Sequence, residues 1–451
     1  MTELDYDRIG STIRNVPILS KAHGDWRSRD APSRPQYRNY CHSSGVRFAN
    51  RHPACGLSPR AERSAARREL FRPCAGHHHR KRILTGRTVN TGPKNLPFAT
   101  VEDVQKRASG EVRIRRVGFR SGTDAELAAL HAVETPVAAE LRWNRMPQPI
   151  DSYIAFARNL PSQFNDRAWL AETPEGSPVA CGFCWSNSAG DQRAMECDLA
   201  VRRDRRREGV GSQLFERICA TSADEGRTLL TWTTSDAVPA GEAFSRRLGA
   251  QPARANRTSE LSLGDVNWQM TDEWTKARLA RARGYHLEMI DGVFPEHLRA
   301  DAVTFHHIMQ TAPREDLEVG NVLVGPDDIA ELDRALLEAG RLRWTALMRD
   351  PTGACVGGTE ATFEHWEPAL VLQQNTGIDP AHRGLGLAKW AKAAMLDRIR
   401  HDRPEAQKIR AGNAFSNAPM LAINDALGFG VIGTRTEWQS NVDDARRALS
   451  R

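Results

Sequence analysis

Two short stretches of similar composition are the part of the sequence best suited to bind a charged ligand. Residues 206–211 read Arg-Arg-Glu-Gly-Val-Gly and residues 383–388 read Arg-Gly-Leu-Gly-Leu-Ala, and each lies between a strand-like and a helix-like run. The first amides of a helix have no acceptor within it, the helix dipole adds partial positive charge there, and small residues let a ligand approach the backbone. We therefore expect two phosphate-binding turns, called the first turn (206–211) and the second turn (383–388).

The surroundings of the two turns repeat as well. Arg206 lies 43 residues before Gly249 of a Leu-Gly pair, and Arg383 lies 45 residues before Gly428 of another such pair. Helix-like, strand-like and helix-like runs fill both intervals in the same order. The turns are offset by 177 residues, which is far longer than a solenoid unit and is typical of a duplicated domain.

With these features the chain resembles the GNAT superfamily of acetyl-CoA-dependent N-acetyltransferases. The signature of that superfamily is Gln or Arg, two residues, Gly, one residue, then Gly or Ala, and both turns fit it. The arrangement is similar to that of tandem GNAT proteins of the mycothiol synthase type, over about residues 112 to 440. The resemblance implies an α/β (α+β) fold with two GNAT-type mixed β-sheets flanked by helices, with acetyl-CoA as co-substrate and no metal.

Composition divides the chain into three parts. Residues 1–100 hold 19 Lys and Arg against 7 acidic residues, whereas the remainder holds 44 against 49, so the basic charge belongs to the leader. We expect a basic, disordered leader at 1–110, an N-terminal GNAT domain at 111–265 (the first copy) and a C-terminal GNAT domain at 266–451 (the second copy). The sequence has no apolar run of membrane-spanning length and no signal-peptide core, which favours a cytoplasmic protein with reduced cysteines.

Cysteine and histidine residues offer two further candidate sites. In the leader, zinc is one interpretation and a basic segment without fixed structure, or a reading frame extended upstream of the true start, is the other; the cluster is Cys41, His42, His52, Cys55, Cys74, His77, His78 and His79. Cys181 and Cys184 suggest a redox or metal pair, but residues three apart in a strand face opposite sides, which favours two structural cysteines.

Hydrophobic periodicity and turn residues predict the same element order in both copies. In the first copy we expect strands at 112–119, 168–172, 179–185, 195–201 and 228–233, and helices at 124–133, 151–159, 210–224 and 239–248. In the second copy we expect strands at 285–290, 343–349, 356–363, 370–378, 408–411 and 431–438, and helices at 268–283, 296–309, 326–339, 385–400 and 417–427. Gly428 is the expected C-cap of the last helix, because glycine tolerates the left-handed conformation.

The resemblance assigns the coenzyme to the two turns and their neighbours. The expected coenzyme-binding residues are Arg206, Arg207, Gly209, Val210 and Gly211 in the first copy and Ile378, Arg383, Gly384, Leu385, Gly386, Leu387, Ala388 and Asn417 in the second. An ordinary glycine-rich loop is the alternative. Gly377 suggests a strand bulge that would offer an oxyanion-binding amide beside Ile378, and the matching Ala200 gives no such indication. The run 202–207 either grips the adenosine phosphates or is a solvated basic turn.

The two copies differ in the residues at the places of the expected acid and base. GNAT enzymes often carry a Tyr that protonates the thiolate at the place of Asn424, and an amide cannot act as an acid, so Asn424 is assigned a positioning role for water or sulfur. The first copy has Val238 and Ser245 at the places of Asn417 and Asn424, which suggests a degenerate coenzyme site. Glu360 is the preferred base. Other carboxylates and the imidazole of a neighbouring loop are alternatives or ordinary polar-face residues, and these are Glu196, Asp198, Glu364 and His365.

The sequence thus predicts acetyl transfer from acetyl-CoA to a primary amine of a small-molecule acceptor, with the second copy active. Tryptophan-containing segments at 142–145 and 365–367 either shape the acceptor pocket or belong to the core. The alternative function is a non-catalytic acyl-CoA sensor or scaffold. A nucleic-acid adaptor would depend wholly on the leader, and neither nucleic acid nor membrane is an expected partner. A monomer or a homodimer is expected.

Overall fold

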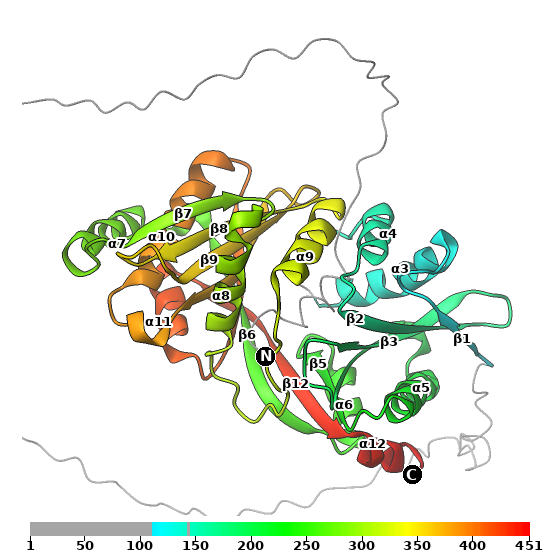
Figure 1. Cartoon of the computed structure of the whole chain (residues 1–451). Coiled ribbons are helices and arrows are strands. Elements are labelled where there is room, and N and C mark those ends of the chain that lie inside the picture. The colour runs from blue at the N-terminus through cyan, green and yellow to red at the C-terminus, as the bar shows by residue number, and fades with distance from the viewer. Residues whose placement is uncertain (1–110, 142–144) are drawn as a thin grey trace, which may run out of the picture. The chain divides into compact units, whose positions relative to one another are not determined.

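The computed structural model describes residues 111–141 and 145–451. Their strands form one mixed sheet of 12 strands in the order β1-β2-β3-β4-β5-β12-β6-β11-β10-β9-β8-β7. Helices lie on both faces of this sheet, and the two longest strands, β6 and β12, run side by side through its middle (Figure 1).

The first copy opens with a strand, two helices and a three-stranded meander before the first turn. The elements are β1 (Arg113–Val117), α3 (Asp124–Ala139), α4 (Ile150–Arg158), β2 (Phe164–Glu172), β3 (Pro178–Asn187), β4 (Ala194–Val201), α5 (Val210–Asp224), β5 (Leu229–Ser235), α6 (Pro239–Arg247) and β6 (Gln251–Ser262). Helix α3 begins at a capping box, in which Thr123 and Glu126 each accept from the other's backbone amide.

The second copy follows the same course and adds a terminal helix. Its elements are α7 (Trp268–Arg281), β7 (His286–Asp291), α8 (Arg299–Met309), α9 (Pro326–Glu338), β8 (Arg341–Arg349), β9 (Cys355–Glu364), β10 (Leu370–Ile378), α10 (Leu387–Asp402), β11 (Lys408–Ala414), α11 (Ala418–Leu427), β12 (Gly430–Asn441) and α12 (Val442–Leu449). Gly428 ends α11 at φ 94°, as predicted for a left-handed C-cap.

The last strand of each copy pairs with the other copy. β12 runs antiparallel to β5, with Trp438 opposite Trp232, and β6 runs antiparallel to β11, with Leu261 opposite Ile409. β12 and β6 also pair with each other, so the two half-sheets become one. Each half-sheet therefore has its open edge covered by the neighbouring copy, which removes two exposed strand edges.

One hydrophobic cluster of the core is shared by the two copies, and two further clusters lie on the other face of the sheet, one for each copy. One hydrophobic cluster contains side chains of α3, α4, α8 and α9, among them Leu130, Phe156, Phe305 and Ile329. On the other face, a second cluster packs α5 and α12 against the first copy, and a third packs α10 and α11 against the second. The C-terminal helix thus contributes to the core of the first copy.

The structure confirms the predicted fold class and most elements, with two additions. The sequence analysis missed β6 and α12, which hold their places through pairing and packing with the other copy. The 3₁₀ turn Glu296–Leu298 precedes α8, so the helix expected at 296–309 begins later. The predicted boundaries at residues 110 and 265 stay predictions, and the leader with its candidate zinc ligands lies outside the described residues.

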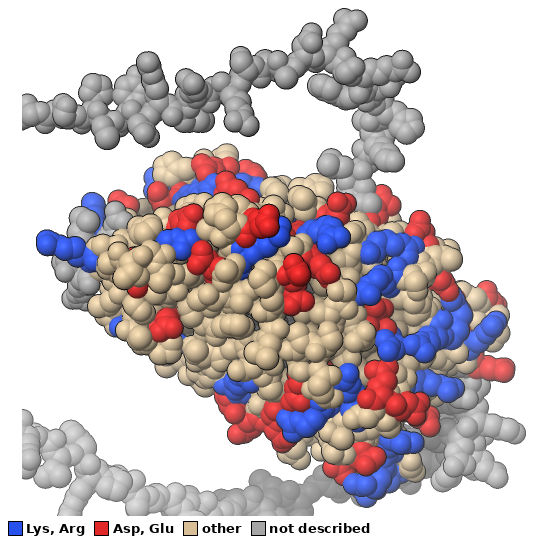
Figure 2. Space-filling view, viewed as in Figure 1, with Lys and Arg blue, Asp and Glu red and all other residues tan. Residues whose placement is uncertain are grey.

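Charges on the visible surface are mixed. Lys and Arg alternate with Asp and Glu over the face in Figure 2, without a large field of one sign. None of the helices in the described ranges is long and apolar enough to cross a membrane.

Candidate functional site

The two turns have the same backbone conformation. Arg207 and Gly384 occupy the second place with φ of 72° and 81°, and Gly209 and Gly386 occupy the fourth with φ of 84° and 81°. The amides of residues 207–212 and 384–389 donate to no acceptor among the described residues. A Cβ added to either fourth-place glycine would meet nothing within 4 Å. Both turns are therefore open, with unpaired amides suited to a phosphate group.

The arginine that begins each turn anchors the loop. Arg206 donates from Nε to the Val201 carbonyl at 3.0 Å and pairs with Glu140 at 2.6 Å. Arg383 donates from Nε to the Ile378 carbonyl at 2.9 Å and from Nη2 to Thr311 Oγ1 at 2.6 Å. Each guanidinium thus ties the turn to the end of the preceding strand and to a helix end. The part that Arg383 would take in coenzyme binding stays a prediction.

The sheet splits beside each turn. β4 pairs with β5 only from Ala194 to Glu196, and β10 pairs with β11 only from Leu370 to Gln373. The Arg202 amide donates to Val179 on β3 at 3.0 Å, so by the alternation of an antiparallel ladder the amides of Leu199 and Val201 point into the split of the first copy. β10 has the bulge expected near Gly377, between Gln373 and Thr376, whereas β4 keeps a regular register.

A cavity of about 370 Å³ occupies the split of the first copy. It is lined by the first turn and the start of α5, and by Val137 and Leu141, at and just beyond the end of α3. Its walls come from the splayed strands β4 and β5 and from α6, including Trp232, Ser245 and Phe244. A cavity in the split that is lined in part by unpaired amides can hold an elongated ligand with an anionic end.

Asp198 is the carboxylate that lines this cavity. It lies on β4 between Cys197 and Leu199, both of which face α5, so its own side chain lies on the α3 face. The Leu199 amide donates to Asp198 Oδ1 at 2.8 Å. From the sequence Asp198 was only an alternative base, because the split that exposes it is a tertiary feature.

The second copy is packed differently on the corresponding face. A Cβ on Gly377 would lie 2.5 Å from Met309 Sδ, so α8 lies directly against the strand that lines the split. In the first copy the corresponding strand position is Ala200. Glycine at 377 thus serves the close approach of Met309, in addition to the bulge nearby.

Glu360, the predicted base, is in a buried polar network. Its side chain is 3% exposed and accepts from Asn375 Nδ2 at 2.9 Å and from Thr345 Oγ1 at 3.2 Å. Arg343 lies 3.7 Å away and is ion-paired with the buried Asp333. The carboxylate is thereby enclosed by three polar groups, as expected for a structural network.

Asn424 and Asn417 also have partners inside the protein. Asn424 is 1% exposed and donates to Asn413 Oδ1 at 2.6 Å, and Asn417 caps α11 by accepting from the Met420 amide at 3.4 Å. In the first copy, Ser245 accepts from Trp232 Nε1 at 2.8 Å and donates to the Gly241 carbonyl at 2.9 Å. Neither Asn424 nor Ser245 therefore offers the acidic hydroxyl that a tyrosine would have at its place.

The remaining candidates do not line the cavity of the first copy. Glu364 pairs with Arg145 and with Arg341 at 2.7 Å, which joins the two copies, and His365 is exposed. Trp366 packs on the core, and residues 142–144 lie outside the described part of the chain. Cys181 and Cys184 face opposite core clusters, as expected, and burial raises the pKa of the Cys184 thiol.

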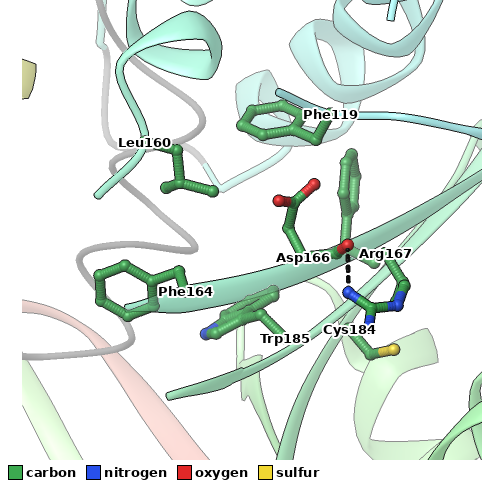
Figure 3. Close-up of a pocket in the computed structure, with 8 residues that line it drawn as sticks. Phe119, Leu160, Phe164, Asp166, Arg167, Cys184 and Trp185 are labelled. Carbon is green, nitrogen blue, oxygen red and sulfur yellow. Dashed lines mark hydrogen bonds between the residues drawn. The ribbon is translucent and has the colours of Figure 1, made fainter. Parts of the chain in front are cut away.

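A second opening in the first copy is too small for a ligand. Phe119, Leu160, Phe164 and Trp185 surround it, and it has a volume of about 10 Å³ (Figure 3). That is room for a single water molecule at most. It is a packing gap.

Comparison with known proteins agrees with this geometry. Residues 136–250 match the acetyltransferase (GNAT) family, and no curated protein matches the sequence. A solved tandem GNAT protein from the clavulanic acid biosynthesis pathway, without AcCoA, is 20% identical over 74% of this chain and 99% of that one, at a TM-score of 0.59. A GCN5-related N-acetyltransferase from Sphaerobacter thermophilus is 11% identical over 73% of this chain and 96% of its own, at 0.50. At these identities the solved structures show the fold.

Proposed function

From the tandem GNAT fold of this chain, and from the acyl transfer from acyl-CoA that its GNAT domain implies, we propose that the protein moves an acetyl group from acetyl-CoA to a primary amine of a small molecule. The first copy is the proposed site. The observation that carries this proposal is the cavity of about 370 Å³ that joins the unpaired amides of the first turn to Asp198 through the split sheet. This assignment differs from the sequence-based expectation of an active second copy.

The first turn would hold the diphosphate of the coenzyme. Its amides supply hydrogen-bond donors, and the dipole of α5 adds partial positive charge. The pantetheine arm would then follow the split between β4 and β5, where the amides of Leu199 and Val201 point toward it. This places the thioester near the middle of the sheet.

The amine would approach from the α3 side. Asp198 attracts the ammonium form and takes its proton, and the neutral amine attacks the thioester carbonyl. The Leu199 amide becomes an oxyanion donor when Asp198 turns to the acceptor. Thiols have pKa values of about 8.5, so the coenzyme can leave as a thiolate without a neighbouring tyrosine. The absence of an acid at Ser245 and Asn424 is compatible with this route.

An acyl-CoA sensor is the second candidate. It is favoured by the hydrogen bonds of Ser245, which engage the hydroxyl on both sides and leave no acid at this place. A sensor would hold the coenzyme without releasing thiol.

The test is thiol release from acetyl-CoA with a panel of small primary amines. We expect turnover with at least one amine, and a loss of about 10² to 10⁴ in kcat/KM for Asp198→Asn, the range of general base catalysis. Asp236→Asn is the matched control, because Asp236 follows β5 and does not line the cavity. Tight coenzyme binding without thiol release for any amine would favour the sensor, and absence of coenzyme binding would contradict both functions.

A further inference from the structure

Four arginines lie in or beside the first turn, and two of them have acidic partners. Arg205 pairs with Glu208 at 2.8 Å, and Arg206 pairs with Glu140. Arg207 makes no hydrogen bond or ion pair with any described residue, and the guanidinium of Arg247 has the Ser212 hydroxyl and the Phe244 ring as neighbours. All four line the cavity. Arg207 and Arg247 are therefore cations without a carboxylate partner at the anion-binding end.

The second copy lacks both cations. At the offsets that relate the copies, Gly384 takes the place of Arg207 and Ala426 takes the place of Arg247. The backbone of the two turns is the same, so this difference concerns side chains alone. An arginine at φ 72° is also an unusual choice, because a residue with a Cβ is disfavoured in this region and glycine would serve the turn at lower cost.

Arg247 lies beside the start of α5. Its Nη2 donates to Ser212 Oγ in the first turn of that helix, and its guanidinium carbon lies 5.6 Å from the centre of the Phe244 ring. The side chain is thus held beside the unpaired amides, at the mouth of the cavity, where Arg207 is exposed. The backbone amides and the helix dipole already supply donors and positive charge for a diphosphate. Two further cations can therefore pair with an additional dianionic group.

We propose that Arg207 and Arg247 recognise the 3′-phosphate of the coenzyme, so that the first copy selects 3′-phosphorylated coenzyme A over its dephosphorylated form and over shorter pantetheine thioesters. This inference rests on the proposed function and names the form of acyl donor that the same site accepts. The second turn has Gly384 and Ala426 at these places and so lacks this pair of arginines.

The experiment is isothermal titration calorimetry of the full chain with coenzyme A and with 3′-dephospho-coenzyme A. All proteins carry Gly386→Glu, which adds a carboxylate to the second turn so that the first copy reports alone. Two variants install the residues of the second copy, Arg207→Gly and Arg247→Ala. Arg217→Ala is the matched control, because Arg217 is an exposed cation of α5 outside the cavity. Thermal unfolding of each variant checks that it is folded.

The expected preference for coenzyme A is at least about tenfold, since a hydrogen bond to a charged group contributes about one tenfold step or more. Each of the two variants should reduce this ratio by weakening coenzyme A binding alone, and Arg217→Ala should keep it. Equal affinity for both ligands, or a ratio that neither variant changes, would overturn the inference and leave the proposed function standing. Failure of both ligands to bind would overturn the proposed function and the inference with it.

Discussion

The two copies share a backbone and differ in what surrounds it. Both have a turn with two residues at positive φ, an anchoring arginine and a split sheet. In the first copy the split contains a cavity that reaches Asp198, whereas in the second copy Met309 lies against Gly377 and Glu360 is enclosed by hydrogen bonds.

The difference shows that the conformation of the turn and the shape of the split beside it are separable. The turn depends on local backbone conformation, which a few residues specify. The shape of the split depends in addition on the side chains of the helix that packs against it, such as Met309 of α8 beside Gly377. The same turn conformation can therefore lie beside different side-chain surroundings in the two copies.

The largest expected effect comes from placing a carboxylate in the first turn. The same change in the second turn is the comparison. Gly209→Glu should reduce coenzyme affinity by about a hundredfold or more and abolish turnover, because a like charge beside the diphosphate costs several kcal/mol. Gly386→Glu should leave turnover intact. Gly209→Asn is the control, since Asn tolerates positive φ and adds no charge. The reverse pattern, with turnover lost only in Gly386→Glu, would move the reaction to the second copy.

The next effect separates stability from chemistry. Glu360→Gln should lower the free energy of unfolding by about 1–3 kcal/mol, because it removes a buried charged acceptor beside Arg343. Turnover of the folded protein should be unchanged, as measured by kcat/KM below the unfolding transition. A loss of kcat comparable to that of Asp198→Asn would show that Glu360 takes part in the reaction.

Trp438 lies on β12, the strand of the second copy that pairs with β5 of the first. A substitution there tests whether this strand stabilises the first copy. Its Nε1 donates to Thr234 Oγ1 at 2.8 Å, and Thr234 lines the cavity. Trp438→Phe should lower the free energy of unfolding by about 1–2 kcal/mol and raise the KM for acetyl-CoA. Trp344→Phe, at a buried site in the second copy, should lower stability without changing KM. Equal KM values in both variants would argue against support across the copies.

The smallest effect concerns Asp191, which accepts from the Gly320 amide at 3.0 Å and so links the β3–β4 loop to the α8–α9 segment. The Arg193 side chain, with nearby amides, lowers the pKa of Asp191 to about 2. A lowered folded-state pKa gives stability that is present above pH of about 4 and lost as pH falls toward 2. Asp191→Asn should therefore cost about 1 kcal/mol at pH 7 and little at pH 2, as measured by urea unfolding. A cost independent of pH would contradict this assignment.

The sequence by itself determined the local parts of this protein. Glycine placement predicted both turns and the C-cap at Gly428, and periodicity predicted α5 and β10 with the bounds that the structure has. These features depend on residues close together in the chain, so their physical causes are visible in a short window.

Tertiary structure decided how the parts combine. The pairing of β6 with β11 joins residues 146 to 158 positions apart, and that of β12 with β5 joins residues 200 to 212 positions apart. Polar strands such as β6 also carry little periodicity of their own. The cavity beside Asp198 and the close approach of Met309 to Gly377 depend on helix packing across the split. Side-chain volume at such contacts is fixed only when the sheet and its helices have assembled, because packing is a property of neighbours in space.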